Sequence, residues 1–198
     1  MILLYAVAAG LIAGLVSGGR LSALADARFR LWPVALAGLA FQVLLFSSPL
    51  TASVGSLGPT LYVVSMLAVV MALVVNLRLP GFALIVLGAA LNLVAIVANG
   101  GQMPASPEAV ALLSGTAVLP TTDFSNSVIA GPHTYFAFLG DIFALPRPLP
   151  LANVFSIGDV LVGVGGAWYI VRRMHERPQP APSATGRPGR GVRTASHG

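Results

Sequence analysis

Five apolar segments constrain the fold of this chain more than any other feature. They run from Ile2 to Gly18, Leu31 to Ser48, Leu57 to Leu77, Gly81 to Ala98 and Ser156 to Val171. Each is close to the roughly 17 to 25 residues that a helix needs to cross a bilayer, and helices leave no backbone group unpaired in lipid. Only 9% of the residues are charged, whereas a soluble domain has about 25%. We therefore predict an all-α integral membrane protein with a bundle of about five transmembrane helices.

The arginines predict the orientation of this bundle. They lie between the first two segments (Arg20, Arg28, Arg30), between the third and fourth (Arg78), and after the fifth (Arg172, Arg173, Arg177). Five alternating helices would place all of these residues on one side of the membrane, and arginine-rich loops are typically cytoplasmic. We therefore expect a multi-pass protein of the bacterial plasma (inner) membrane, with its N-terminus outside and its C-terminus in the cytoplasm. The start, MILLYAVAAG, lacks the basic stretch of a signal peptide, so we expect the first segment to remain as a helix.

The connection over residues 99–155 would then lie outside, and its sequence predicts structure. Residues 107–115 have the pattern of a short helix, with Ser106 as N-cap and Pro107 at the first helical position. Residues 133–145 are apolar but too short to span, which favours an interfacial or re-entrant helix. Asn99-Gly100-Gly101 is typical of a helix C-terminus, because glycine tolerates the left-handed conformation.

Composition limits the function classes. The chain has no cysteine and only three histidines, so we expect neither a thiolate site nor a metal, and nothing predicts a cofactor. The net charge of +5 comes from helix flanks and tail, so we expect a lipid bilayer, rather than nucleic acid, as its partner. We divide the chain into a transmembrane domain, residues 1–173, and a disordered cytoplasmic tail, residues 174–198, rich in Arg, Pro and Gly.

Asp141 and Asp159 are the candidate catalytic residues. Both lie at the edges of apolar sequence, where an ionisable group is costly and therefore indicates function. Two carboxylates close together in a poorly hydrated place do not both ionise easily, which makes one an acid and the other a base. This pattern predicts an intramembrane aspartate-dyad hydrolase, with Asn99, His133, Asn153 and Ser156 as candidates for orienting groups or for substrate binding.

Two resemblances bear on this prediction. Phe155-Ser156-Ile157-Gly158-Asp159, with Asp141 upstream, resembles the last motifs of the lipoprotein signal peptidase family, in which two aspartates form the catalytic dyad. The resemblance implies a peptidase that acts at the outer face on a membrane-anchored protein or lipid substrate. The whole chain resembles an uncharacterised bacterial family of small multi-pass proteins that share Asn-Gly-Gly-x-Met-Pro, Leu-Gly-Asp-Ile and Ser-x-Gly-Asp elements.

A structural interpretation competes with the catalytic one. Ser156 and Asp159 have the spacing of a capping box, and a carboxylate in a first helical turn is favoured by the helix dipole. The rival function is therefore a non-enzymatic binding or assembly subunit whose outer cap docks a lipid, a ligand or a partner protein. We expect Gln42, Asn76 and Asn92 to bond between helices, and Gly163, Gly165 and Gly166 to permit close helix contact.

Overall fold

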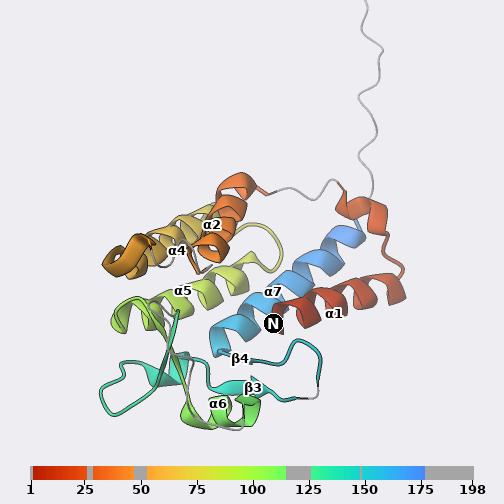
Figure 1. Ribbon diagram of the computed structural model, residues 1–198. Helices are drawn as coiled ribbons and strands as arrows, with labels where there is room; N and C mark the ends of the chain where they lie inside the picture. Colours follow the sequence, from red (N-terminus) through yellow and green to blue (C-terminus); the bar gives the residue numbers. More distant parts are fainter. Residues whose placement is uncertain (1, 26–28, 47–52, 115–125, 148, 177–198) are drawn as a thin grey trace, which may run out of the picture.

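A helix occupies each of the five predicted segments. The computed structural model describes residues 2–25, 29–46, 53–114, 126–147 and 149–176, so the predictions for Arg28, Arg177 and most of the tail lie outside the described residues. The long helices are α1 (Ile2–Val16), α2 (Trp32–Leu45), α4 (Gly58–Val74), α5 (Phe82–Ala98) and α7 (Ile157–Met174), as Figure 1 shows. Helices make up most of the described chain, as we predicted.

Small residues set the packing around α7. Helix α1 runs parallel to it, because Gly10 lies against Ala167 and Gly14 lies against Met174. Helix α5 runs antiparallel on another side of α7, where Gly88 lies against Gly158 and Gly81 against Gly165. A Cβ atom on Gly10, or on any of the four glycines that pair α5 with α7, would come within 3.0 Å of a backbone atom of the neighbouring helix. A larger residue at these positions would therefore push the helices apart.

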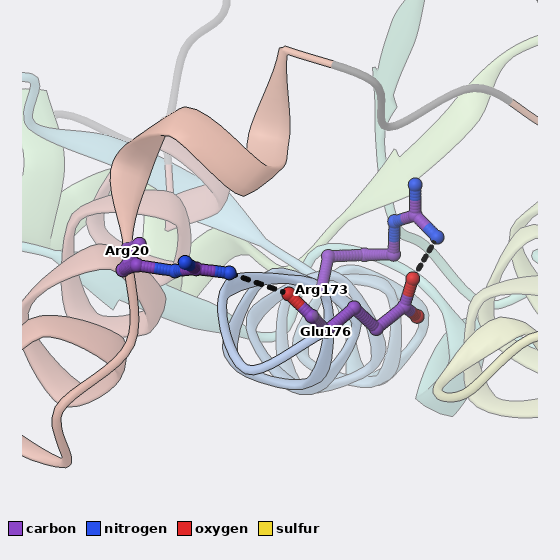
Figure 2. Close-up of polar contacts among 3 residues, drawn as sticks. All are labelled: Arg20, Arg173 and Glu176. Carbon is purple, nitrogen blue, oxygen red and sulfur yellow. Dashed lines mark hydrogen bonds and ion pairs between the residues drawn. The ribbon is translucent and has the colours of Figure 1, made fainter. Parts of the chain in front are cut away.

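Arginines lie just after α1 (Arg20), just before α2 (Arg30) and at the end of α7 (Arg172, Arg173), and we call these the arginine-bearing ends. Because successive helices alternate in direction, these ends lie on the same side of the bundle. The backbone N–H of Arg20, just after α1, donates to the carbonyl of Met174 at the end of α7, 2.8 Å away. The N–H of Arg30, before α2, donates to Oδ1 of Asn76, which follows α4, at 2.7 Å. Figure 2 shows the first of these junctions, where Arg20 donates to the carbonyl of Glu176 at 3.2 Å and the Glu176 carboxylate pairs with Arg173.

The opposite end of the helices carries a small cap. Strand β1 (Met103–Ala105) pairs in parallel with β2 (Ser127–Ile129), and β3 (Phe143–Leu145) pairs antiparallel with β4 (Asn153–Phe155). Helix α6 (Pro107–Ser114) lies beside β3 and β4 (Figure 1). Ser106 caps α6 as predicted, because its Oγ accepts the N–H of Ala109 at 3.0 Å. Gly100 and Gly101 have positive φ angles at the end of α5, as the C-cap pattern indicated.

Residues 133–145 do not form the interfacial or re-entrant helix that we predicted. They contain a 3-10 turn, Ala137–Leu139, followed by strand β3. Phe136 has a left-handed φ of 50°, and a Cβ atom on Gly140 would lie 2.2 Å from the carbonyl of Pro104. The chain therefore turns in order to run beside β1, where the backbone of Asp141 bonds to Pro104 and Ser106. This long-range pairing satisfies backbone groups that the sequence pattern had assigned to a helix.

Much of the apolar surface of the helices faces outward. The buried apolar cluster is small: Leu45, Tyr62, Ala95, Ile96, Met103 and Leu139. Val16, Val43 and Met71 are more than half exposed. Among the described helices, one is both long and apolar enough to cross a membrane, Gly55–Val74, in which α4 continues a short 3-10 turn; α1, α2 and α5 are apolar but shorter. Five membrane spans therefore stay a prediction.

Two adjacent glycines of α7 provide a test of the packing. Gly165→Ala would place a Cβ atom 2.5 Å from the carbonyl of Gly81, whereas a Cβ atom on Gly166 meets nothing within 4 Å. We expect Gly165→Ala to lower the free energy of unfolding by about 1–3 kcal/mol through overpacking. Gly166→Ala should be neutral or stabilising by up to about 1 kcal/mol, because alanine favours a helix. Thermal unfolding of both variants in detergent measures the difference, and equal losses would contradict the close α5–α7 contact.

Candidate functional site

A cavity of about 360 Å³ lies where the cap meets the helices. One part of its lining is apolar and comes mainly from α4, α5 and β1. The other part is polar and comes from α5, the two sheets and the first turn of α7. The lining residues are Tyr62, Met66, Asn92, Ile96, Met103, Asn126, Ser127, Asp141, Asn153, Val154 and Asp159. Asp141 and Asp159, the two candidate catalytic residues, thus face the same cavity.

Asp159 is held by the capping box that its spacing predicts. The Ser156 Oγ accepts the backbone N–H of Asp159 at 2.9 Å, and the backbone N–H of Ser156 donates to Oδ2 of Asp159 at 3.1 Å. Both bonds use N–H groups that have no partner inside the helix. The box therefore fixes the carboxylate in the first turn of α7 and leaves it at the cavity wall.

Asn92 of α5 connects this first turn to the rest of the bundle. Its Nδ2 donates to Oδ1 of Asp159 at 2.9 Å, and its Oδ1 accepts the hydroxyl of Ser156 at 2.8 Å. The amide lies directly on the backbone of α7, since a Cβ atom on Gly158 would be 2.0 Å from its Oδ1. We predicted a bond between helices for Asn92, and the structure adds that its partners are Ser156 and Asp159.

Asp141 reaches the cavity from a different element. Its backbone N–H donates to Pro104 at 2.8 Å, and its carbonyl accepts the N–H of Ser106 at 3.0 Å, which forms a parallel bridge to β1. Burial, followed by the negative charge of Asp159, raises the pKa of the Asp141 carboxyl from 3.8 to about 7. Near neutral pH Asp141 therefore holds a proton for a large part of the time.

The arrangement of the two carboxyls offers acid–base chemistry. One carboxyl with a pKa near neutrality beside a second, hydrogen-bonded carboxylate can give and take protons at physiological pH. Among the described residues of the lining there is no arginine or histidine, so these residues offer no side-chain cation to an anionic ligand. Among the described residues, no group of three or more His, Cys, Asp or Glu side chains is placed to hold a metal ion.

The predicted orienting residues occupy different places. Asn153 lines the cavity from β4, and Ser156 bonds to Asp159 and is fully buried. Asn99 instead binds the backbone of Tyr135 through both amide atoms, at 2.8 and 3.0 Å, and thereby holds the loop before the 3-10 turn. His133 is exposed on that loop. Asn99 and His133 are absent from the described cavity lining, so the structure does not bring them to the carboxyl pair.

Sequence reasoning missed several cavity residues. Tyr62 and Met66 lie in an apolar helix where nothing distinguishes them from packing residues, and Asn126 and Ser127 lie in polar sequence where β2 begins. Asn92 did carry a signal, because an amide in an apolar helix needs a partner. Nothing in the sequence pattern alone identified which partner that would be.

Comparisons with known proteins place the chain in a family without assigning a role. A family model described as a family of unknown function, DUF5317, matches residues 26–171, which include every described residue that lines the cavity. A Thermotoga maritima protein described as uncharacterized is 29% identical over 106 residues, 54% of this chain and 60% of that relative. No solved structure matches. The prediction of an uncharacterised family is confirmed, and the matching model is not that of the lipoprotein signal peptidases.

The raised pKa of Asp141 predicts how stability depends on pH. The folded state holds the proton more tightly than the unfolded chain, so stability is highest below about pH 4 for this group and falls as pH rises to about 7. We expect Asp141→Asn to remove this loss and to be more stable than the wild type at pH 8 by about 1–3 kcal/mol, since one pKa unit is worth about 1.4 kcal/mol and solvent screens part of it.

Melting temperatures of the two proteins between about pH 4 and pH 9 measure this effect. Glu108→Gln is the matched control, because it changes an exposed carboxylate of the cap. An Asp141→Asn curve parallel to the wild-type curve would contradict a proton held at Asp141.

Proposed function

We propose that this chain, which belongs to the DUF5317 family of unknown function, is a five-helix membrane protein whose Asp141 and Asp159 catalyse hydrolysis at the outer face. The observation that carries the proposal is that both carboxyls line one cavity and that the charge of Asp159 acts on Asp141. The chain spans about 60% of the length of the Thermotoga relative, which is itself uncharacterized, so the activity is inferred from the site alone.

The exposed apolar helices support membrane residence. Only 22% of the most apolar part of Gly55–Val74 is buried, whereas the core helix of a soluble protein would be mostly buried. Outward-facing leucines and valines on α1, α2 and α5 continue this surface. Such a surface requires lipid tails as its solvent. Helices α1, α2 and α5 would cross the hydrocarbon layer of the bilayer, with their polar ends near the headgroups.

The arginine-bearing ends support the orientation. Arg20, Arg30, Arg172 and Arg173 lie at helix ends joined by hydrogen bonds, while the cap and cavity lie at the other ends. Arginine-rich ends are typically cytoplasmic, so the cavity would open near the outer surface of the membrane. Substrates would then reach the carboxyl pair from outside or from the outer leaflet.

Because the chain has no cysteine, single-cysteine variants test this orientation directly. We expect His133→Cys, on the cap, to react with a membrane-impermeant maleimide on intact cells. Ser22→Cys, beside the arginine-bearing ends, should react only after the membrane is permeabilised. Both positions are exposed on the protein surface, so the side of the membrane on which each residue lies decides whether it is labelled. The reverse labelling pattern would refute the orientation, and labelling of both residues in intact cells would refute the span between them.

The reaction that fits the pair is hydrolysis of a neutral acyl or amide bond. One carboxylate takes a proton from a water molecule, whose oxygen forms a bond to the substrate carbonyl carbon. The other carboxyl donates its proton to the carbonyl oxygen and stabilises the tetrahedral intermediate. The proton taken from water then passes to the leaving nitrogen or oxygen as its bond to carbon breaks. The former carbonyl oxygen returns its proton to the second carboxyl as the C=O bond re-forms, which restores both side chains. The amide groups of Asn126 and Asn153 and the Ser127 hydroxyl line the cavity, where they suit the polar atoms of an uncharged substrate.

Substitution of either aspartate tests the reaction. We expect Asp141→Asn and Asp159→Asn each to lower turnover by at least about 100-fold, since acid–base groups contribute about 10² to 10⁴. The measurement compares new N-termini and released fragments among membrane proteins of cells that express the wild type or a variant. Glu108→Gln is the control, because it changes a cap carboxylate outside the described cavity lining. Unchanged cleavage products in both aspartate variants would refute the hydrolase.

The second candidate function is a binding or assembly subunit. The observation that favours it is the complete capping box, which accounts for Asp159 without any reaction. The same cavity would then hold a neutral ligand through its amides, or receive a partner segment. This function predicts that both aspartate variants change ligand or partner binding while no membrane protein of the cell changes its cleavage state.

A further inference from the structure

The two carboxyls of the cavity have opposite hydrogen-bonding environments. Both oxygens of Asp159 accept from donors, namely Nδ2 of Asn92 at 2.9 Å and the backbone N–H of Ser156 at 3.1 Å. Asp159 also lies in the first turn of α7, where the helix dipole favours negative charge. Donors that surround a carboxyl stabilise its ionised form.

The direction of each bond in this network follows from the buried hydroxyl of Ser156. That hydroxyl accepts the N–H of Asp159 and donates its own proton to Oδ1 of Asn92 at 2.8 Å. The Asn92 amide can accept the Ser156 hydroxyl proton through Oδ1 only in the orientation in which its Nδ2 points at Asp159. A protonated Asp159 that donated to a reversed Asn92 amide would deprive the Ser156 hydroxyl of this acceptor. Ser156 is 0% exposed, so water does not replace it, and an unpaired buried donor is unfavourable.

Asp141 has no comparable set of donors. Its backbone N–H and carbonyl are used by the bridge to β1, and within the described residues no hydrogen bond to its carboxyl is found. A partly buried carboxyl without donors favours its neutral form, because the charged form loses hydration without compensation. The asymmetry between the two aspartates therefore arises from what surrounds them rather than from residue type.

We infer that Asn92 is a positioning residue that holds Asp159 as the ionised member of the pair and so leaves the proton on Asp141. The inference rests on the proposed function for its chemical meaning, because it assigns the two roles of the reaction. Asp159 takes the proton from water, and Asp141 donates to the substrate carbonyl. Asn92 itself acts through Asp159 and the buried hydroxyl of Ser156.

Carbodiimide labelling tests the assignment without a substrate. N,N′-dicyclohexylcarbodiimide adds to protonated carboxyl groups in apolar surroundings, and peptide mass spectrometry identifies the residue that carries the adduct. In full-length wild-type protein in detergent, we expect label on Asp141 that decreases with a midpoint near pH 7. Asp159, whose two oxygens accept from Asn92 and Ser156, should carry at least about tenfold less label than Asp141 at pH 6. Predominant label on Asp159 would overturn the assignment.

Substitution of Asn92 tests the positioning role. Asn92→Ala removes one donor to Asp159 and the acceptor of Ser156, so the proton should move toward Asp159. We expect the ratio of label on Asp159 to label on Asp141 to rise by about tenfold at pH 6, because a carboxylate that loses a donor is less stabilised in its ionised form. Ser156→Ala should change the ratio in the same direction, because the Asn92 amide then loses its hydroxyl partner. If Asn92→Ala does not fold, Ser156→Ala provides the same test.

Asn76→Ala is the matched control for a purely structural effect. Asn76, just after α4, also has a buried side-chain amide with three hydrogen bonds, two to the backbone of Arg30 and one to Ala72, but it lies among the arginine-bearing ends. Its substitution should lower the melting temperature and leave the labelling ratio unchanged. A folded Asn92→Ala protein with the wild-type ratio, or the same shift in Asn76→Ala, would overturn the positioning role. Since no cleavage is measured, a failed search for hydrolysis does not alter either outcome.

Discussion

The close approach of α5 and α7 is the constraint on which the site depends. Gly88 lies against the backbone of Gly158, and Gly81 lies against that of Gly165, so the two helices meet at both ends of their contact. This separation is what allows the short amide of Asn92 to reach both Ser156 and Asp159. A larger residue at Gly88 or Gly158 would therefore remove more than a packing contact, because it would withdraw Asn92 from the carboxylate.

Capping and chemistry are compatible uses of the same carboxylate. A capping box needs a hydrogen-bond acceptor at its third helical position, which an ionised carboxylate provides, and a general base must be ionised and fixed in direction. Asp159 satisfies both needs, because hydrogen bonds to Ser156 and Asn92 fix the position of its carboxylate while the residue still lines the cavity. The structural interpretation and the catalytic one were alternatives at the level of sequence, but the geometry does not force a choice between them.

The sequence predicted the helices well and the cap poorly, for a physical reason. Apolar runs determine helices locally, so the segments from Ile2 and from Gly81 end within a few residues of the predicted positions. The capping box at Ser156 is likewise local. Residues 133–145 form a turn and a strand because Gly140 and Asp141 meet β1, which is more than thirty residues earlier in the chain. No local pattern encodes such a contact, and the same limitation concealed Tyr62, Asn126 and the partners of Asn92.

The position of α7 in the chain has a consequence for assembly. Its partners α1 and α5 precede it, and Asp159 enters with its first turn, so the cavity remains incomplete until α7 docks. Contacts between α1 and α7 join residues about 160 positions apart, and contacts of such high sequence separation form late because loop closure must come first. Before that step Asn92 lacks both of its partners on α7. The arrival of α7 would therefore complete the fold and create the acid–base pair in a single event.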